Sequence, residues 1–152
     1  MEMSELRVRG VLTHFGYLLV IRRVINEKGI PITFYALPGG HVQEGEELEA
    51  AVIRAIKEET GLAVRVAMRC AHQGMPVDAN RVTLFMRVVL TEQCRQLPIL
   101  VAEQTNKQDG VRTPNWLSLS AVERAEFRPS ETRAVLRAEL ALLAQNDGGS
   151  VL

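Results

Sequence analysis

Two adjacent glutamates, Glu58 and Glu59, lie near the end of a stretch with helical periodicity. On a helical wheel of about 100° per residue, Leu48, Val52 and Ile56 share one apolar face. Glu59 falls inside that apolar sector, where a carboxylate is costly unless it is paired or bound to a metal. Glu58 lies about 100° away, so both carboxylates can reach one edge of the helix.

Two carboxylates about 4 Å apart repel by roughly 4 kcal/mol at an effective dielectric constant of about 20, and a divalent cation reverses the sign of that interaction. Ligand sets made of oxygen favour Mg²⁺ or Mn²⁺ over zinc. The alternative is a solvated helix face on which Arg54 and Glu58 form an i,i+4 ion pair. That alternative explains the exposed glutamates of the segment, but it does not explain Glu59.

The turn before this segment contains Pro38, Gly39 and Gly40. Glycine reaches backbone angles that other residues avoid, so Gly39 and Gly40 can bring a carbonyl or an N–H group close to a metal or a phosphate. A Pro-Gly-Gly sequence alone predicts only a turn, and the helix that follows it gives the turn its interest.

Together the turn and the helix resemble the Nudix box, G-x5-E-x7-R-E-U-x-E-E-x-G-U, where U is a bulky aliphatic residue. The match covers 23 residues, from 40 to 62. The matching residues are Gly40, Glu46, Arg54, Ile56, Glu58, Glu59, Gly61 and Leu62. The preceding FYALPGGHV also resembles the usual approach to this box, whereas the similarity is looser over the rest of the chain.

The resemblance implies an α-β-α sandwich with a mixed β-sheet between helices. It also implies a hydrolase that cleaves a phosphoanhydride in a nucleoside diphosphate linked to another moiety, with Mg²⁺ or Mn²⁺ as cofactor. Carried over to this chain, it makes Glu58 and Glu59 the principal metal ligands and adds the Gly40 carbonyl as a further ligand. Glu46 becomes a structural or outer ligand, and Arg54 orients the carboxylates in the catalytic site.

The chain departs from the family pattern at Ala55, where the box has a glutamate. In some members that glutamate is a metal ligand or the general base. Three consequences are open: a base from a later loop, for which Asp109 is the first candidate and Glu103 the second; fewer metals and slower turnover; or loss of hydrolysis. In the last case the domain would act as a nucleotide-binding or sensor module, or keep only the fold as an interaction domain.

Substrate-binding candidates lie before the box and in its turn. Arg9, with Arg7, alternates along the first expected strand and is placed to face a phosphate, although both also suit an exposed edge strand. Tyr35 offers a ring for stacking on a base, and His41 follows the turn of Gly39 and Gly40. The predicted substrate-binding residues are therefore Arg9, Tyr35, Gly39, Gly40 and His41.

The sequence does not choose a substrate. Pro76 follows Gly61 by fifteen residues, which resembles ADP-ribose pyrophosphatases but is a weak sign because one insertion would create or remove it. Nucleoside triphosphates, nucleotide sugars and dinucleoside polyphosphates all stay open as small-molecule substrates.

Composition limits the remaining classes. The formal net charge is zero, from 18 basic and 18 acidic residues, so no basic surface for duplex nucleic acid is expected. There is no apolar run of the roughly 20 residues that a membrane span needs, no signal peptide, and no CxxC motif around Cys70 or Cys94, so we expect a cytoplasmic protein. A homodimer stays open.

The elements that must position these residues are those of one α/β domain over residues 1–152, with a frayed tail at 145–152. Helices are expected at 47–60, capped by Gly61, and at 130–144, capped by Ser130, one on each face of the sheet. Strands are expected at 6–13, 17–21, 33–36, 62–73, 81–91 and around Trp116, with a long loop at 93–110.

Overall fold

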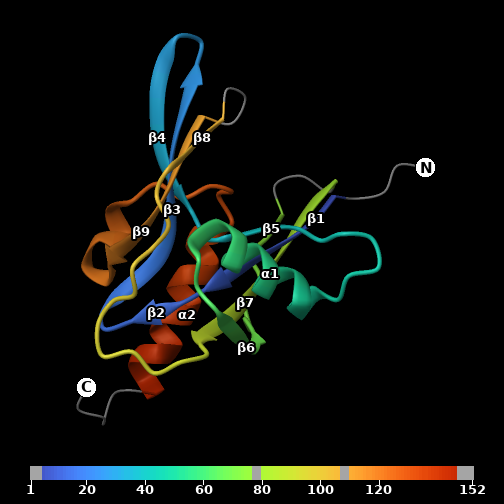
Figure 1. Cartoon of the computed structure of the whole chain (residues 1–152), viewed down its shortest axis with the longest axis vertical. Coiled ribbons are helices and arrows are strands. Elements are labelled where there is room, and N and C mark those ends of the chain that lie inside the picture. Colours follow the sequence, from blue (N-terminus) through green and yellow to red (C-terminus); the bar gives the residue numbers. More distant parts are fainter. Residues whose placement is uncertain (1–4, 77–79, 107–109, 147–152) are drawn as a thin grey trace.

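The computed structural model of the protein describes residues 5–76, 80–106 and 110–146. Its strands form two sheets (Figure 1). The first sheet has four strands, in the order β5 (Gly39–His41), β1 (Glu5–Val11), β7 (Arg81–Leu90) and β6 (Val64–Arg69). The second has five, in the order β2 (Thr13–His14), β3 (Tyr17–Glu27), β9 (Gly110–Ser118) and β8 (Gln104–Asn106), with β4 (Ile30–Ala36) paired to β3. The helices are α1 (Leu48–Thr60), the short 3-10 helix η1 (Leu119–Arg124) and α2 (Thr132–Asn146).

Only the first sheet is mixed, because β1 and β7 run parallel whereas β1 with β5 and β6 with β7 run antiparallel. The named pairs of the second sheet are all antiparallel. The expected single mixed sheet is therefore a pair of sheets, since the sequence pattern shows which residues are extended but not which strands exchange hydrogen bonds.

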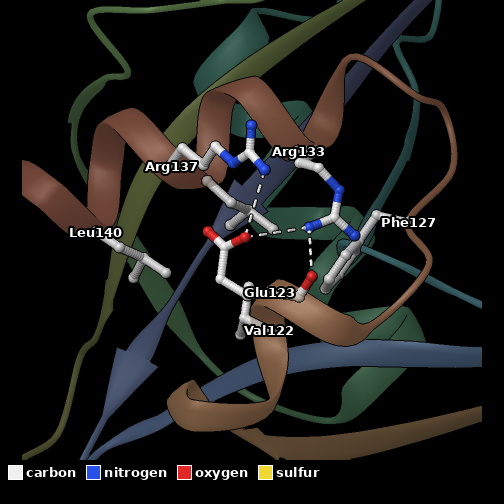
Figure 2. Close-up of a pocket in the computed structure, with 7 residues that line it drawn as sticks. Val122, Glu123, Phe127, Arg133, Arg137 and Leu140 are labelled. Carbon is white, nitrogen blue, oxygen red and sulfur yellow. Dashed lines mark hydrogen bonds and ion pairs between the residues drawn. The ribbon is translucent and has the colours of Figure 1, made fainter.

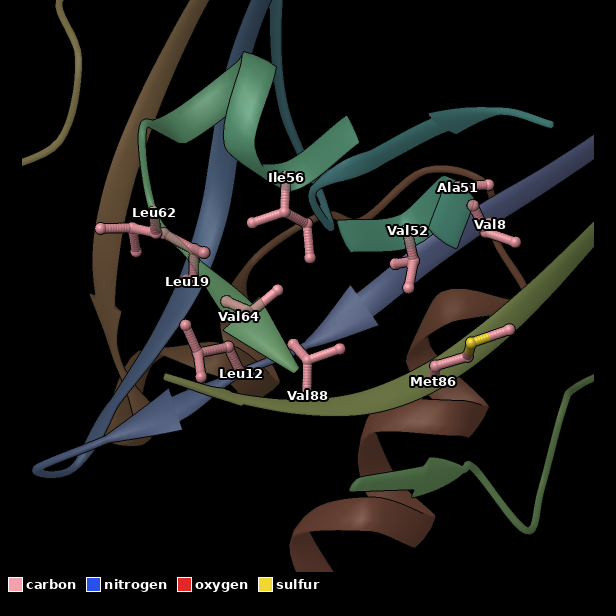
Figure 3. Packing of buried hydrophobic residues seen from close by; sticks show 10 residues of the cluster. All are labelled: Val8, Leu12, Leu19, Ala51, Val52, Ile56, Leu62, Val64, Met86 and Val88. Atoms are coloured by element: carbon pink, nitrogen blue, oxygen red, sulfur yellow. The ribbon is translucent and has the colours of Figure 1, made fainter. Parts of the chain in front are cut away.

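The two long helices cover opposite faces of the strands, which confirms the expected α-β-α layering. Adjacent residues of β3 face opposite ways, so Leu19 packs in the core under α1 and Leu18 packs in the core under α2. The core under α1 consists of Val8, Leu12, Leu19, Ala51, Val52, Ile56, Leu62, Val64, Met86 and Val88 (Figure 3). Val135 and Leu136 bring α2 into the second core.

The region around residues 26–36 is more regular than the sequence predicts. The strand expected at 17–21 continues to Glu27, and a tight turn at Lys28 and Gly29, both with positive φ, leads directly into β4. Pro31 is tolerated because, among the described residues, β3 is the strand partner of β4 at this position, and the further bridge of β4 to Phe127 lies at Tyr35. The expected break at Gly39 and Gly40 is also wrong, because both residues pair with β1 as part of β5.

Strand β6 is shorter than the expected 62–73. It ends at Arg69, and the side-chain amide of Gln73 then takes the place of a strand partner. Gln73 Oε1 accepts a 2.7 Å hydrogen bond from the Phe85 N–H, and Nε2 donates to the Phe85 carbonyl at 2.9 Å. A side chain that satisfies both backbone groups cannot be read from strand periodicity.

The ends of the helices agree with the sequence except at one cap. Gly61 adopts the left-handed conformation and its N–H donates to the Lys57 carbonyl, as predicted for a C-cap. The second helix begins at Thr132, so Ser130 is not its N-cap residue. The loop expected at 93–110 contains the short β8, and the strand around Trp116 extends over Gly110–Ser118.

A buried ion pair joins the first sheet to α2. Arg87 Nε lies 2.8 Å from Glu139 Oε2, and Glu139 is almost fully buried. Burial, followed by the neighbouring Glu139, raises the pKa of the Cys70 thiol to about 12, so this thiol stays protonated at neutral pH. No helix in the described part of the chain has both the length and the apolar character to cross a bilayer.

Candidate active site

Glu59 lies in the last turn of α1 and turns toward β5, with 17% of its side chain exposed. Its Oε1 accepts a 3.0 Å hydrogen bond from the backbone N–H of Gly39. Its Oε2 lies 3.9 Å from Nη1 of Arg112 on β9. The carboxylate is therefore held on the inner side of the helix, where the apolar periodicity places it.

The electrostatic surroundings of Glu59 act in two directions. Burial raises the pKa of its carboxyl above the ordinary value, while the Gly39 hydrogen bond and the charges of Arg9, Arg112 and Arg23 act to lower it. Because the first of these effects is the largest, the ionised form is incompletely compensated. An additional cation beside Glu59 would stabilise that ionised form.

Arg54 links the turn before α1 to the helix itself. Its Nε and Nη2 donate to the two carboxylate oxygens of Glu46 at 2.7 and 3.0 Å. Its Nη1 donates to Glu58 at 3.2 Å, and Nη2 also donates to the His41 carbonyl at 3.0 Å. Hydrogen bonds from Arg54, and then from the Gln43 N–H, hold the pKa of Glu46 below its ordinary value.

The Arg54 network gives its two glutamates different roles. Both oxygens of Glu46 are engaged by Arg54, which suits Glu46 to anchoring the arginine. The side chain of Glu58 is 65% exposed and shares one contact with the same arginine. Arg54 thus fixes the direction of Glu58 while leaving it accessible to a ligand.

Gly39 and Gly40 of strand β5 lie close to β1. A Cβ atom added to Gly39 would lie 2.0 Å from the Val8 carbonyl oxygen, so only glycine fits this position. A Cβ atom added to Gly40 would lie 3.5 Å from the Cβ of Ala55, which is itself buried. The position that lacks the box glutamate therefore faces the Gly40 backbone.

A cavity of about 490 Å³ is lined by residues of β1, β3, β4, β7 and the segment before α2. Its lining includes the guanidinium groups of Arg7, Arg9, Arg23, Arg81 and Arg128, and we call it the arginine cavity. Two of these, Arg9 and Arg23, also act electrostatically on Glu59. Glu59 therefore lies within electrostatic reach of two arginines of the cavity.

The remaining residues singled out in the sequence take different places. Tyr35 is half-buried against Phe127, with the ring centroids 6.0 Å apart, and does not line the arginine cavity. The exposed His41 ring places Nδ1 3.1 Å from Glu5. Glu103 is exposed and directly precedes β8. Asp109 lies outside the described residues.

The sequence reasoning missed most of the cavity. Arg23, Arg81, Arg128 and the buried Glu131 line it together with the expected Arg9. They come from β3, β7 and the segment before α2. The only usable signal was the alternation of Arg7 and Arg9, which places both side chains on one face of β1.

A second cavity, between η1 and α2, does not offer a comparable site. Its volume is about 110 Å³, below the range of small-molecule pockets. Figure 2 shows Glu123 directed at Arg133 and Arg137, at 3.7 and 3.4 Å. Glu123 engages both guanidinium groups, and the small volume makes this cavity a gap between packed elements.

The donor set at the end of α1 suits a hard divalent cation. In the part of the chain that the structure describes, no three His, Cys, Asp or Glu side chains gather into a ligand cluster. Mg²⁺ commonly takes only one or two protein carboxylates and completes its shell with water and phosphate. The pair Glu58 and Glu59 fits such an ion, whereas a structural zinc site needs four protein ligands.

Comparison with known proteins decides the family. The family model described as the NUDIX domain matches residues 3–138. The chain belongs to the Nudix family. Its relatives in this family include the ADP-ribose pyrophosphatase of Methanocaldococcus jannaschii, which is 47% identical over 60 residues. That alignment covers 39% of this chain and only 33% of the relative.

Solved structures agree with the Nudix fold. The ORF135 protein of E. coli superposes with a TM-score of 0.66 at 19% identity, over 94% of each chain. The NUDIX domain of NrtR from Shewanella oneidensis, solved with ADP ribose, gives a TM-score of 0.60 at 20% identity, over 93% of this chain and 90% of that one. At these identities the likeness concerns the fold.

Proposed function

We propose that this Nudix chain is a divalent-metal-dependent hydrolase that cleaves a phosphoanhydride in a nucleoside diphosphate linked to another moiety, such as a nucleoside triphosphate or a nucleotide sugar. The observation that carries the proposal is the position of Glu59. Its carboxylate is mostly buried, accepts a hydrogen bond from the Gly39 N–H and is subject to the charges of Arg9 and Arg23, which line the arginine cavity. A purely structural helix gains nothing from a carboxylate at that place.

In the proposed mechanism, Glu58 and Glu59 hold Mg²⁺ or Mn²⁺, with the Gly40 carbonyl as a further oxygen ligand. When bound, the divalent cation supplies the positive charge that stabilises the phosphate oxygens during displacement. Arg54, anchored by Glu46, keeps Glu58 directed at the site. Glu46 itself acts from outside the ligand shell or as an outer ligand.

The substrate lies with its phosphates between the carboxylates and the arginine cavity. Arg9 contributes a positive charge there, and the turn of Gly39, Gly40 and His41 supplies the adjoining backbone. Tyr35 acts from behind the cavity wall rather than by stacking on a base, because its ring packs on Phe127. The matched segment of the ADP-ribose pyrophosphatase makes ADP-ribose a natural first compound to try.

The general base is proposed to come from the chain beyond the box, because Ala55 carries no carboxylate. Asp109 is the first candidate and the exposed Glu103 the second. Each would accept the proton of the attacking water.

The experiment is a turnover screen with Mg²⁺ and with Mn²⁺ over nucleoside triphosphates, nucleotide sugars and dinucleoside polyphosphates. Glu59→Gln removes the charge at the site, and Glu49→Gln removes an exposed charge from the first turn of the same helix. We expect turnover that needs the metal, is lost in Glu59→Gln and persists in Glu49→Gln. Equal activity in the two variants would contradict the proposal.

A second candidate is a nucleotide-binding or sensor module without turnover. The observation that favours it is Ala55, buried opposite Gly40 where the box has a glutamate. The NrtR domain, whose structure contains ADP ribose, has the same fold. Nucleotide binding by a chain inactive on the whole screen would support this candidate.

A further inference from the structure

Guanidinium groups dominate the lining of the arginine cavity. Among the described residues, five of them and one carboxylate, that of Glu131, line it. Glu5, outside the lining, pairs with Arg7 and Arg81, and Arg128 pairs with Glu27 and Glu126. Arg9 is deeply placed, and burial lowers its pKa to about 10, which still leaves it charged at neutral pH. Its Nη1 donates to the Leu37 carbonyl at 2.6 Å, while its Nε is buried without a hydrogen-bond partner among the described residues.

The register of the first sheet gives the cavity its length. Arg9 pairs with Gly39, whose N–H holds Glu59, so Arg9 marks the end next to the carboxylates. Arg81 pairs with Glu5, four residues before Arg9 on β1. At about 3.3 Å per residue, the two ends are separated by about 13 Å along the strand. One diphosphate is too short to contact both ends.

The far end is built around Glu5, which lies outside the cavity lining. Arg7 Nη2 lies 3.0 Å and Arg81 Nε 3.5 Å from the carboxylate of Glu5. This shared contact holds two guanidinium groups side by side and leaves other donors of each group unused. The Nε of Arg7 is buried and has no hydrogen-bond partner in the described part of the chain.

The cavity has no aromatic surface for a base. Phe34 is the one aromatic residue in its lining, and it is buried. The guanidinium carbons of Arg128 and Arg23 lie over its ring at 4.5 and 5.5 Å from the centroid. The two arginines therefore cover the ring by cation–π contact, so its face is not offered to a base. The charge of Arg128 is also shared with Glu27 and Glu126, at 3.1 and 2.9 Å.

We propose that the far end of the arginine cavity, formed by Arg7 and Arg81, binds a phosphate monoester on the substrate, separate from the diphosphate that is cleaved. The preferred substrate is then a nucleoside diphosphate derivative with a phosphorylated sugar. ADP-ribose, whose sugars carry no such group, fills only part of the site. This inference rests on the proposed function for the placement of the scissile diphosphate at Glu59.

The test compares ADP-ribose with ADP-ribose 2′-phosphate, which differ only in the monoester. Dissociation constants are measured by calorimetry in EDTA, so the result does not depend on metal or on turnover. We expect the phosphorylated compound to bind at least tenfold more tightly, since charge-assisted bonds to guanidinium groups are strong and specific. A ratio near one would overturn the proposal.

Variants locate the effect. Arg81→Gln removes one far-end charge, and Arg65→Gln removes an exposed charge on β6, away from the cavity. The ratio between the two ligands should fall toward one in Arg81→Gln and persist in Arg65→Gln. An unchanged ratio in Arg81→Gln would contradict the assignment, even if wild type discriminates.

Two further arms separate this inference from other outcomes. Inorganic phosphate that binds as tightly as ADP-ribose 2′-phosphate would assign the far end to free phosphate and overturn the substrate preference. Turnover by wild type is measured separately with Mg²⁺. If the protein prefers ADP-ribose 2′-phosphate but shows no turnover, the phosphate site stands and the proposed hydrolase activity is wrong. If it shows turnover but no preference between the two ligands, the hydrolase stands and the phosphate site is wrong.

Discussion

Ala55 stands where the family pattern has a glutamate, and the effect of this difference on catalysis is the main chemical question at this site. Ala55 is buried on the inner side of α1, and its Cβ lies 3.5 Å from the place where a Cβ of Gly40 would stand. A longer side chain there would start beside the glycine turn and one helical turn before Glu59. The carboxylate that the family pattern has at this position would therefore join Glu58 and Glu59.

Restoring that carboxylate tests what its absence costs. In Ala55→Glu we expect turnover at least tenfold above wild type, because a carboxylate beside Glu58 and Glu59 would add a base next to the one proposed beyond the box, and a well-placed base is typically worth 10²–10⁴-fold. Ala55→Gln is the matched control, with the same length and no charge. Steady-state rates at saturating Mg²⁺ check the prediction, and equal rates in the two variants would show that position 55 has no role in the chemistry.

Glu131 illustrates how a single cavity residue affects stability. Burial raises the pKa of its carboxyl, and the charge of Arg9 only partly opposes this. The folded state therefore binds the proton more tightly than the unfolded state, so stability falls as the pH rises through the folded pKa. Below the ordinary glutamate pKa of about 4.3 both states are protonated and this effect vanishes.

We therefore expect Glu131→Gln to be more stable than wild type at pH 7 and equal to it at pH 3.5. Urea unfolding at the two pH values measures the difference. Glu44→Gln, at an exposed position, is the control. A variant that is less stable than wild type at pH 7 would show that the arginines of the cavity, rather than burial, dominate the energy of Glu131.

At the scale of elements, β5 does most to position the site. It pairs with β1 through Gly39 and Gly40, and its first N–H aligns Glu59. The strand then leads to α1 through the segment that Arg54 ties to Glu46. A disturbance of the β5–β1 contact should therefore reach both the fold and the carboxylates.

Gly39→Ala puts this to the test. Its Cβ would lie 2.0 Å from the Val8 oxygen, so we expect a loss of about 3 kcal/mol or more in the free energy of unfolding. Gly45→Ala is the control, because Gly45 also has a positive φ but nothing within 4 Å of an added Cβ. That control should lose only about 1–2 kcal/mol. Urea unfolding measures both losses. Similar losses of unfolding free energy in the two variants would show that the β5–β1 contact does not position the site.

For the molecule as a whole, the sequence predicts the parts of the site that are contiguous. The Nudix box lies within 23 residues, so its spacing places Glu58, Glu59 and Arg54 on one helix before any fold is known. The existence of the two helices also follows from periodicity, and the resemblance to the Nudix box implied the α-β-α layering. The box and the helices depend on local geometry alone.

The arginine cavity could not be predicted in this way. Its arginines come from β1, β3, β7 and the segment before α2, and only strand register brings them together. A single residue of slip would turn Arg7 and Arg9 to the face covered by α1. The tight β3–β4 hairpin and the Gln73 contact that ends β6 likewise depend on hydrogen-bond partners far along the chain.

The central claim is that water attacks a phosphorus atom at the site of Glu59 and breaks its bond to the bridging oxygen. Turnover in water enriched in ¹⁸O tests this claim most directly. The best substrate of the screen is incubated with Mg²⁺, and the ¹⁸O content of each product is measured by mass spectrometry. We predict one ¹⁸O atom in one phosphate-containing product of wild type and of Glu49→Gln, and no labelled product from Glu59→Gln. Label in the sugar, or labelled phosphate formed equally by Glu59→Gln, would contradict hydrolysis at this site.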